Sequence, residues 1–158
     1  MDFDAYGHLT PYELIESNLE AFEAAFVSNF PESTTRKRIF ERYVAYVEEL
    51  RKIVGDGFTQ WVDGSFVTQK VNPRDIDFLT FLEIDRYEQN REAVDSFRKR
   101  RSEKGVLTDG YFLFIRPVGY SQRHLYELDR DEWFRHFRWG CDDEQKGFIQ
   151  LIFQGHGN

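Results

Sequence analysis

The segment Trp61–Leu82, WVDGSFVTQKVNPRDIDFLTFL, carries the most specific pattern in this chain. It predicts a short strand, a Gly-Ser turn, a polar loop and a second strand that opens with two aspartates. Asp75 and Asp77 are two positions apart, and side chains alternate along a strand, so both carboxylates are expected on one face. Ile76 and Phe78 then point to the opposite face.

Two carboxylates held this close repel each other unless a cation lies between them. The pair therefore predicts a site for a hard divalent metal, most naturally Mg²⁺, with Mn²⁺ as the alternative. Gly64 and Ser65 precede the pair by one short loop. Glycine lets the backbone approach a ligand closely, and serine can offer a backbone N–H and a hydroxyl to a phosphate.

The spacing of these residues resembles a known signature. Gly64-Ser65, nine intervening residues and Asp75-Ile76-Asp77-Phe78 resemble the motif of the DNA polymerase beta-type nucleotidyltransferase superfamily. The longer string DGSFVTQKVNPRDID resembles a small, largely uncharacterised prokaryotic family classed as nucleotidyltransferase-like. The string Lys146-Gly147-Phe148-Ile149 is similar to the short C-terminal strand of that family. Because the superfamily includes members without catalysis, the resemblance implies the fold more directly than an activity.

The whole chain has the length and composition of one packed domain, residues 1–158. Its 158 residues include 16 Phe and 8 Tyr, enough for a real core. The net charge of −7 argues against nucleic-acid binding over the whole surface but leaves local basic patches open. A single cysteine, Cys141, fits a reducing cytoplasm. The sequence shows neither a transmembrane-length apolar run nor a signal-peptide pattern, so we expect a cytoplasmic protein with no membrane partner.

Residues 10–55 predict a helical N-terminal region, ahead of a motif-bearing core over residues 56–158. The first helix is expected to begin at Thr10-Pro11, with Glu13 completing a capping box, and to end near Asn29. A second helix is expected from Ser33 or Thr34 to Val54, followed by Gly55. Apolar residues recur at helical spacing in both, which favours packing in the core over a cofactor site.

The remaining elements alternate between strands and helices. Strands are expected at Phe58–Asp63, Asp75–Ile84, Val106–Ile115 and Gly147–Phe153. Helices are expected at Asp85–Lys104, with Tyr87, Val94 and Phe97 facing inward, and at Leu128–Trp139. The sequence thus predicts an α+β fold: a small mixed β-sheet flanked by helices, with two helices at the N-terminus. The resemblance implies that this is a nucleotidyltransferase-like fold.

Asp109 is the one charged residue in an otherwise apolar and aromatic run. A buried carboxylate without a partner is costly. The resemblance implies a partner, because nucleotidyltransferases of this type carry a third carboxylate on the strand that follows the helix after the aspartate pair. The alternative is that Asp109 belongs to a Thr-Asp-Gly turn between two shorter strands. Glu83, further along the strand of Asp77 and on the same face, is the second candidate for the third carboxylate.

Several basic residues admit two interpretations. Lys70 and Arg74 flank the motif loop and either hold triphosphate oxygens or, for Arg74, neutralise Asp75. The cluster Arg98–Arg101 is either a solvated helix end or a contact for an RNA or nucleotide phosphate. The four histidines, His8, His124, His136 and His156, show no ligand-like spacing with Cys141, so no zinc site is expected. Ser65 is not in a Gly-x-Ser-x-Gly motif, which counts against a serine hydrolase.

The activity that the resemblance implies is metal-dependent transfer of a nucleoside monophosphate from a triphosphate such as ATP to a protein hydroxyl or an RNA end. In that mechanism Asp75 and Asp77 bind Mg²⁺ on the triphosphate, and Gly64 and Ser65 hold the β- and γ-phosphates. Asp109 helps to bind a second metal and accepts the proton of the attacking hydroxyl. Positioning and charge stabilisation supply the catalysis. The sequence holds no motif that names the base.

Some small members of the superfamily act as antitoxins that modify a toxin, and others as toxins that modify RNA. The sequence shows no obvious second domain for a large acceptor, so a partner protein or a homodimer is expected to complete the site. The alternative is a catalytically inactive module of the same fold that binds a partner, as an antitoxin does. Phosphohydrolysis is a third, less favoured class, which would release free nucleotide or phosphate.

Overall fold

The computed structural model describes residues 1–139 and 144–155; Cys141 and His156 lie outside the described residues. Its centre is a five-stranded mixed sheet. The strands follow the order β3 (Leu14–Ser17), β7 (Phe148–Phe153), β4 (Phe58–Asp63), β5 (Ile76–Glu83), β6 (Thr108–Ile115). The middle strand β4 is antiparallel to both neighbours, while β3 with β7 and β5 with β6 are parallel pairs. The predicted mixed sheet is confirmed.

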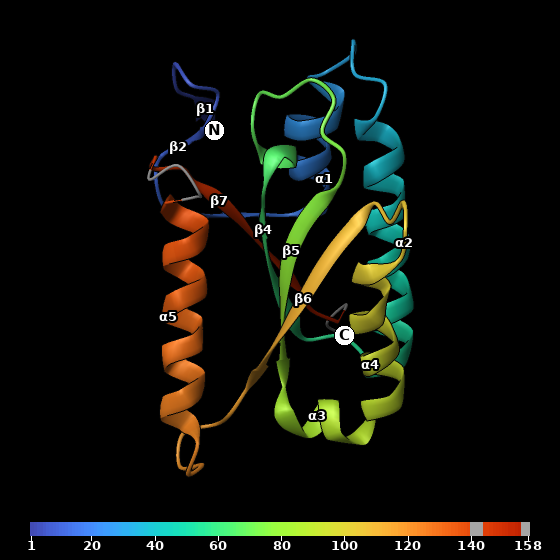
Figure 1. Ribbon diagram of the computed structural model, residues 1–158, viewed down its shortest axis with the longest axis vertical. Coiled ribbons are helices and arrows are strands. Elements are labelled where there is room, and N and C mark those ends of the chain that lie inside the picture. The colour runs from blue at the N-terminus through green and yellow to red at the C-terminus, as the bar shows by residue number, and fades with distance from the viewer. Residues whose placement is uncertain (140–143, 156–158) are drawn as a thin grey trace.

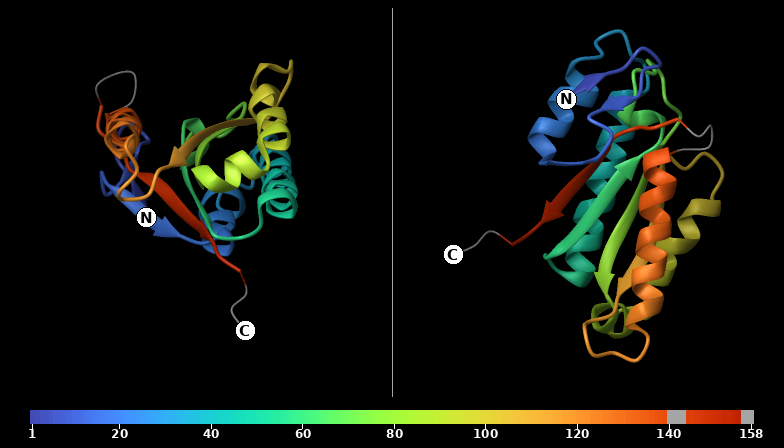
Figure 2. Two further views of the ribbon diagram at one scale, coloured as in Figure 1. Left: turned by 90° about the horizontal axis from the view of Figure 1, so that it is seen from below. Right: turned by 90° about the vertical axis from the view of Figure 1, so that its left-hand side faces the viewer.

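Helices cover both faces of this sheet (Figures 1 and 2). One face packs against the long helix α2 (Arg36–Val54), helped by α1 (Leu19–Glu23), α3 (Ile84–Gln89) and α4 (Arg91–Lys99). Among the described residues, the helix that packs on the other face is α5 (Arg123–Trp139). The predicted α+β class, with a mixed sheet between helices, is confirmed.

Alternation along the strands sorts the side chains between the two faces. On the α2 side, Phe78 of β5 packs edge-on against Tyr43 and Tyr46. On the α5 side, Trp61 of β4 contacts Phe137 of α5 and Phe148 of β7. The stripe predicted for α2 is buried as expected, at Ile39, Tyr43, Tyr46, Val47, Leu50 and Val54.

The predicted first helix is wrong over residues 10–17. Leu9–Thr10 is a short strand, β2, which pairs with β1 (Asp2–Phe3), and β3 then pairs with β7. The helix begins only after Asn18, whose side chain accepts a hydrogen bond of 2.8 Å from the Ala21 N–H. The local capping signal at Thr10 is overridden by tertiary context, because Leu14–Ser17 pair with β7 and extend the sheet.

Past Asn18, the helical segment ends where the sequence predicts. The five residues of α1 continue into a π-helical turn, η1 (Ala24–Ser28), and Asn29 caps it. Helix α2 ends at Val54 with Gly55 as its cap, as expected, but starts at Arg36 rather than at Ser33 or Thr34. The reason is a contact 38 residues along the chain: Asn72 Oδ1 accepts the backbone N–H of Thr34 at 2.8 Å.

Two other helices differ from prediction in extent. The predicted helix Asp85–Lys104 is divided at Asn90 into α3 and α4, and a 3₁₀ turn, η3 (Arg100–Ser102), follows. Its inward residues Tyr87, Val94 and Phe97 are buried as predicted. Helix α5 begins at Arg123, five residues before the predicted start at Leu128, so the aromatic helix covers more of the sheet.

Strand β6 is continuous through Thr-Asp-Gly, so the turn alternative for Asp109 is wrong. Gly110 has a packing role instead. A Cβ at this position would lie 2.8 Å from the Phe78 ring and 2.9 Å from the Tyr46 hydroxyl. Glycine is therefore needed for the close approach of β6 to the core, and the Asp-Gly pair lies in a strand.

Candidate active site

Three aspartates lie side by side across three neighbouring strands. In the register of the sheet, Asp63 at the end of β4 is opposite Asp77, and Asp77 is opposite Asp109 of β6. They share the face that carries Trp61 and Leu79, which pack under α5. They belong to the end of β4 and the starts of β5 and β6, and this end of the sheet is uppermost in Figure 1. Like charges directly opposite each other destabilise a sheet, so this arrangement has a cost that calls for a ligand or a counter-charge.

Asp75, one residue before β5, completes a triad with two members of this row. Single carboxylate oxygens of Asp75, Asp77 and Asp109 all lie within 4.8 Å of one another. The predicted placement of Asp109 on the face of the pair is confirmed. Glu83, the second candidate, is exposed at the far end of β5, about 20 Å along the strand from Asp77. It is therefore not part of the triad.

The crowding of carboxylates perturbs their ionisation. Burial, a hydrogen bond with Asp109 and repulsion from Asp75, Asp109 and Asp63 raise the pKa of Asp77 to about 8. Burial and the charge of Asp109 raise the pKa of Asp75, and nearby Lys70 and Arg74 partly offset this rise. Ionising all three carboxylates at once is costly unless a cation balances their charge. Three carboxylate oxygens this close are suited to a hard divalent cation such as Mg²⁺ or Mn²⁺.

Gly64 is required by the triad itself. Its φ is +81°, a conformation that favours glycine, and a Cβ there would overlap the Asp77 carboxylate. The sequence predicts that this glycine lets the backbone approach a ligand. In the structure it lets the turn approach Asp77, so the Gly-Ser turn and the carboxylate pair form one compact unit.

Ser65 and Lys70 lie on a shallow cavity beside this unit. The cavity has a volume of about 430 Å³ and lies between the motif loop and the N-terminal residues Ala5–His8. Ser65 starts a 3₁₀ turn, η2 (Ser65–Val67). Arg74 is not among the residues that line the cavity, and within the described residues it makes no ion pair with Asp75 inside 4.0 Å, although its charge lowers the pKa of that carboxyl. Lys70 is therefore better placed than Arg74 for a phosphate in this cavity.

Arg36 of α2 holds the loop that follows Gly64 by hydrogen bonds to its backbone. This fully buried arginine donates to the carbonyl oxygens of Phe26 (2.8 Å), Phe66 (2.6 Å), Thr68 (2.8 Å) and Lys70 (2.6 Å). Burial lowers its pKa to about 10, so it keeps its charge at neutral pH. Sequence reasoning missed this residue, since nothing local distinguishes it from the other arginines of α2. Arg36 fixes the loop that connects Gly64 to the triad.

A buried ion pair next to the triad was also missed. Lys146 Nζ lies 2.7 Å from Asp63 Oδ2, and the other Asp63 oxygen, Oδ1, is buried without a hydrogen-bond partner in the described part of the chain. Burial raises the pKa of Asp63, and Lys146 works against that rise. Both residues belong to strings that resemble the nucleotidyltransferase-like family, but their pairing across 83 positions cannot be read from either string.

One residue of the basic cluster 98–101 enters the site. Arg101 Nε lies 2.8 Å from Asp109 Oδ1, and its guanidinium lies 3.4 Å from the centre of the Tyr111 ring. Arg98 and Arg100 instead pair with Asp95 and Glu49. The cluster is thus more than a solvated helix end, because one member neutralises a carboxylate of the triad.

A family model matches residues 1–152, which include every strand and helix described above except the last residue of β7. The chain belongs to DUF6932, a family of unknown function. No curated protein and no solved structure matches it. Membership of DUF6932 assigns no activity, so the chemistry of the aspartate triad must be argued from its geometry. None of the helices in residues 1–139 and 144–155 of this DUF6932 protein is long and apolar enough to cross a membrane.

The raised pKa of Asp77 predicts how metal-free stability varies with pH. The folded state holds this proton up to about pH 8, whereas the unfolded chain releases it near 3.8. The contribution to stability is therefore present below 3.8 and is lost as the pH rises through 8. With allowance for partial exposure, we expect the free energy of unfolding to fall by about 1–2 kcal/mol between pH 6 and pH 8.

Urea unfolding in a chelator-containing buffer at the two pH values measures this fall. The other charged groups facing Asp77 are Asp75 and the flanking ion pairs Arg101–Asp109 and Lys146–Asp63. In Asp77→Asn the fall should shrink. An equal fall in the parent and the variant would assign it to other groups.

Proposed function

We propose that this DUF6932 protein is a metal-dependent nucleotidyltransferase of the DNA polymerase beta type. The observation that carries the proposal is the convergence of Asp75, Asp77 and Asp109 within 4.8 Å, directly against the Gly64 turn. Carboxylates with a purely structural role are not expected to cluster in this way, because each one raises the free-energy cost of ionising its neighbour. A nucleoside triphosphate, with its own negative charge, is a ligand that shares divalent ions with such a site.

In this mechanism the triad would hold Mg²⁺ or Mn²⁺, which supplies positive charge against the phosphates when bound. Ser65 and Lys70 bind phosphate oxygens of the triphosphate in the adjoining cavity. Asp109 accepts the proton of the acceptor hydroxyl. The hydroxyl oxygen forms a bond to the α-phosphorus, the bond to the bridging oxygen breaks, and pyrophosphate leaves. Asp63, neutralised by Lys146, links the end of β4 to the segment before β7.

Arg101 must release Asp109 for this chemistry to proceed. In the structure its Nε occupies one carboxylate oxygen of Asp109. This contact, together with the Lys146–Asp63 pair, is the arrangement that a partner-binding module without catalysis would have, because it neutralises acids by protein groups alone. That module is the second candidate function. The two differ in whether added metal and nucleotide change the protein.

Incubation with labelled ATP, CTP, GTP and UTP in Mg²⁺ or Mn²⁺ tests the proposal. We expect metal-dependent transfer of label to the protein, to a partner protein or to added RNA, with loss of transfer in excess chelator. Free labelled phosphate or nucleoside monophosphate in place of transfer would indicate a phosphohydrolase. The absence of any conversion with all four nucleotides would favour the non-catalytic module.

The biological setting belongs to the proposal as well. Small nucleotidyltransferases of this type act in toxin–antitoxin pairs, and the same setting is proposed for this protein, in the cytoplasm. A partner protein or a second copy of the chain is proposed to complete the site.

A further inference from the structure

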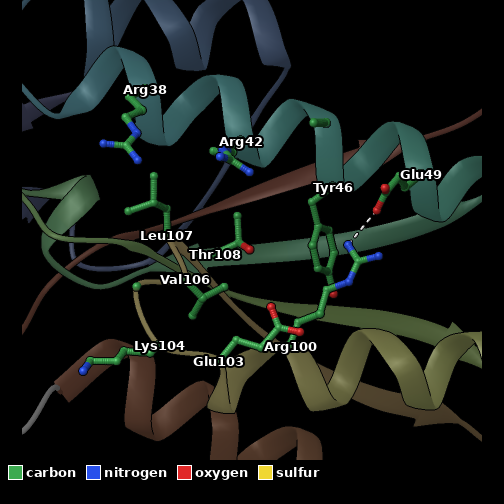
Figure 3. A pocket seen from close by; sticks show the side chains of 12 residues that line it. Arg38, Arg42, Tyr46, Glu49, Arg100, Glu103, Lys104, Val106, Leu107 and Thr108 are labelled. Atoms are coloured by element: carbon green, nitrogen blue, oxygen red, sulfur yellow. Dashed lines mark hydrogen bonds and ion pairs between the residues drawn. The ribbon is translucent and has the colours of Figure 1, made fainter.

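A second pocket, drawn in Figure 3, lies between α2 and the start of β6. This is the face of the sheet opposite to the triad, because Thr108 and Asp109 point to opposite faces of β6. It has a volume of about 340 Å³ and is enclosed by residues 38–49 of α2 on one side and by the connection from η3 to β6 on the other. Arg38 and Arg42, one helical turn apart, project into it from α2. The mechanism proposed for the triad makes no use of this pocket.

The pocket is cationic in a chain that is acidic as a whole. Four cations line it, Arg38, Arg42, Arg100 and Lys104, against two carboxylates, Glu49 and Glu103. Arg100 pairs with Glu49 at 2.6 Å. Within residues 1–139 and 144–155, the other three cations make no ion pair with a carboxylate. The pocket therefore offers excess positive charge to an anion, despite the net charge of −7.

The floor of the pocket contains a buried hydroxyl without a partner. Tyr46 is only 4% exposed, and its hydroxyl has no hydrogen-bond partner among the described residues. Its ring extends from α2 across the pocket toward Arg100. A buried polar group normally finds a partner, because leaving it unpaired costs about 1–3 kcal/mol. The hydroxyl lies against Gly110 and is closed to solvent, so a ligand oxygen beside the arginines would satisfy it once the side chains around it move.

The pocket continues around the edge of the sheet to the triad. Thr108 lines the pocket, while the next residue, Asp109, faces the triad on the other side. Likewise Arg100 lines the pocket, and the next residue, Arg101, contacts Asp109. Strand β6 is the last strand of its sheet, so no further strand separates the two sites. Cations thus follow one another from the pocket, past the edge, to the carboxylates.

We propose that this pocket binds a backbone phosphate of a single-stranded nucleic acid whose terminal hydroxyl reaches the triad. This inference rests on the proposed function and names its acceptor. A single small anion would bind in the pocket but would not extend to Arg101 at the edge of the sheet. A chain of phosphodiesters matches repeated cations along one path. A protein acceptor has no such regular series of anions.

Fluorescence anisotropy with a short labelled oligonucleotide, in RNA and DNA forms of one sequence, tests the inference without metal or nucleotide. In Arg38→Gln/Arg42→Gln we expect binding about tenfold weaker, with a salt dependence reduced by about 0.7 in slope for each lost phosphate contact. The control Lys37→Gln/Lys52→Gln removes the same charge from exposed positions of the same helix. It should stay within about twofold of the parent.

Tyr46→Phe provides a second variant that keeps the fold. Because the hydroxyl has no partner in the described residues, its removal should leave the melting temperature unchanged or higher. Oligonucleotide binding should weaken about fivefold. Equal binding by the parent, the arginine double variant and Tyr46→Phe would overturn the inference. The inference would also be overturned if the parent bound no oligonucleotide and these residues were needed only for binding inorganic pyrophosphate.

The inference and the proposed function fail in different ways. Oligonucleotide binding that depends on Arg38 and Arg42, without any transfer from the four triphosphates, would support the nucleic-acid pocket and contradict the nucleotidyltransferase proposal. Metal-dependent transfer to a protein, with no binding of RNA or DNA that depends on Arg38 and Arg42, would support the nucleotidyltransferase proposal and contradict the nucleic-acid pocket. Stronger binding of one form identifies which nucleic acid is the acceptor.

Discussion

Replacing Asp77 with asparagine is expected to abolish nucleotidyl transfer while leaving the metal-free protein at least as stable as the parent. Asp77 is the central carboxylate of the site, flanked by Asp75, Asp109 and Asp63. Asparagine keeps its shape and removes a charge that the folded state holds at a cost. Transfer should fall about 100-fold or more, the scale of losing a group that stabilises the transition state. At pH 8 the variant should be about 1–2 kcal/mol more stable than the parent without metal.

Melting temperatures with and without Mg²⁺ and nucleotide separate this result from simple misfolding. A ligand that binds only the native state stabilises it by mass action, so the parent should gain and the variant should gain much less. Asp129→Asn, an exposed position of α5, provides the same change of charge away from the site and should behave as the parent. A destabilised Asp77→Asn variant, with a parent indifferent to metal and all four nucleotides, would mean that these aspartates are structural. The partner-binding module would then be the better description.

Replacing Arg36 with methionine is expected to produce the largest loss of stability. The buried guanidinium satisfies carbonyl oxygens of the η1 turn and of the motif loop, and it stacks 3.9 Å above the Phe30 ring. Methionine fills similar space but donates nothing, which leaves several buried carbonyl groups unpaired. We expect a loss on the order of 4 kcal/mol in the free energy of unfolding, measured by urea titration.

Two further variants show whether geometry or charge is responsible. Arg36→Lys keeps the positive charge, but an ammonium is compact and cannot reach groups arranged around a planar guanidinium, so most of the loss should remain. Lys37→Met removes a cation from the adjacent, exposed position and should change stability by less than about 0.5 kcal/mol. A loss below about 1 kcal/mol in Arg36→Met would show that water replaces the arginine and that the loop does not depend on it.

Much of the fold could be predicted because its signals are local. Strand β4 matches its predicted bounds, and β5, β7 and the end of α2 lie within a residue or two of theirs. These segments combine strong apolar periodicity with clear stop signals, so propensity and packing agree. The N-terminal strand β3 was missed because its partner β7 lies more than 130 residues away. Its backbone pairing outweighs a valid local helix signal.

The candidate site likewise has features that the sequence predicts and features that only the tertiary structure determines. Sequence alone predicted that Asp75 and Asp77 lie together, because residues two apart along an extended segment project to the same side. That Asp109 completes the triad was decided by the parallel register of β6 with β5. The contacts of Arg36, Lys146 and Arg101 join segments that are distant along the chain or lie on opposite sides of a turn. Such contacts depend on burial and on which backbone groups lack partners, and these are properties of the packed molecule that no short stretch of residues encodes.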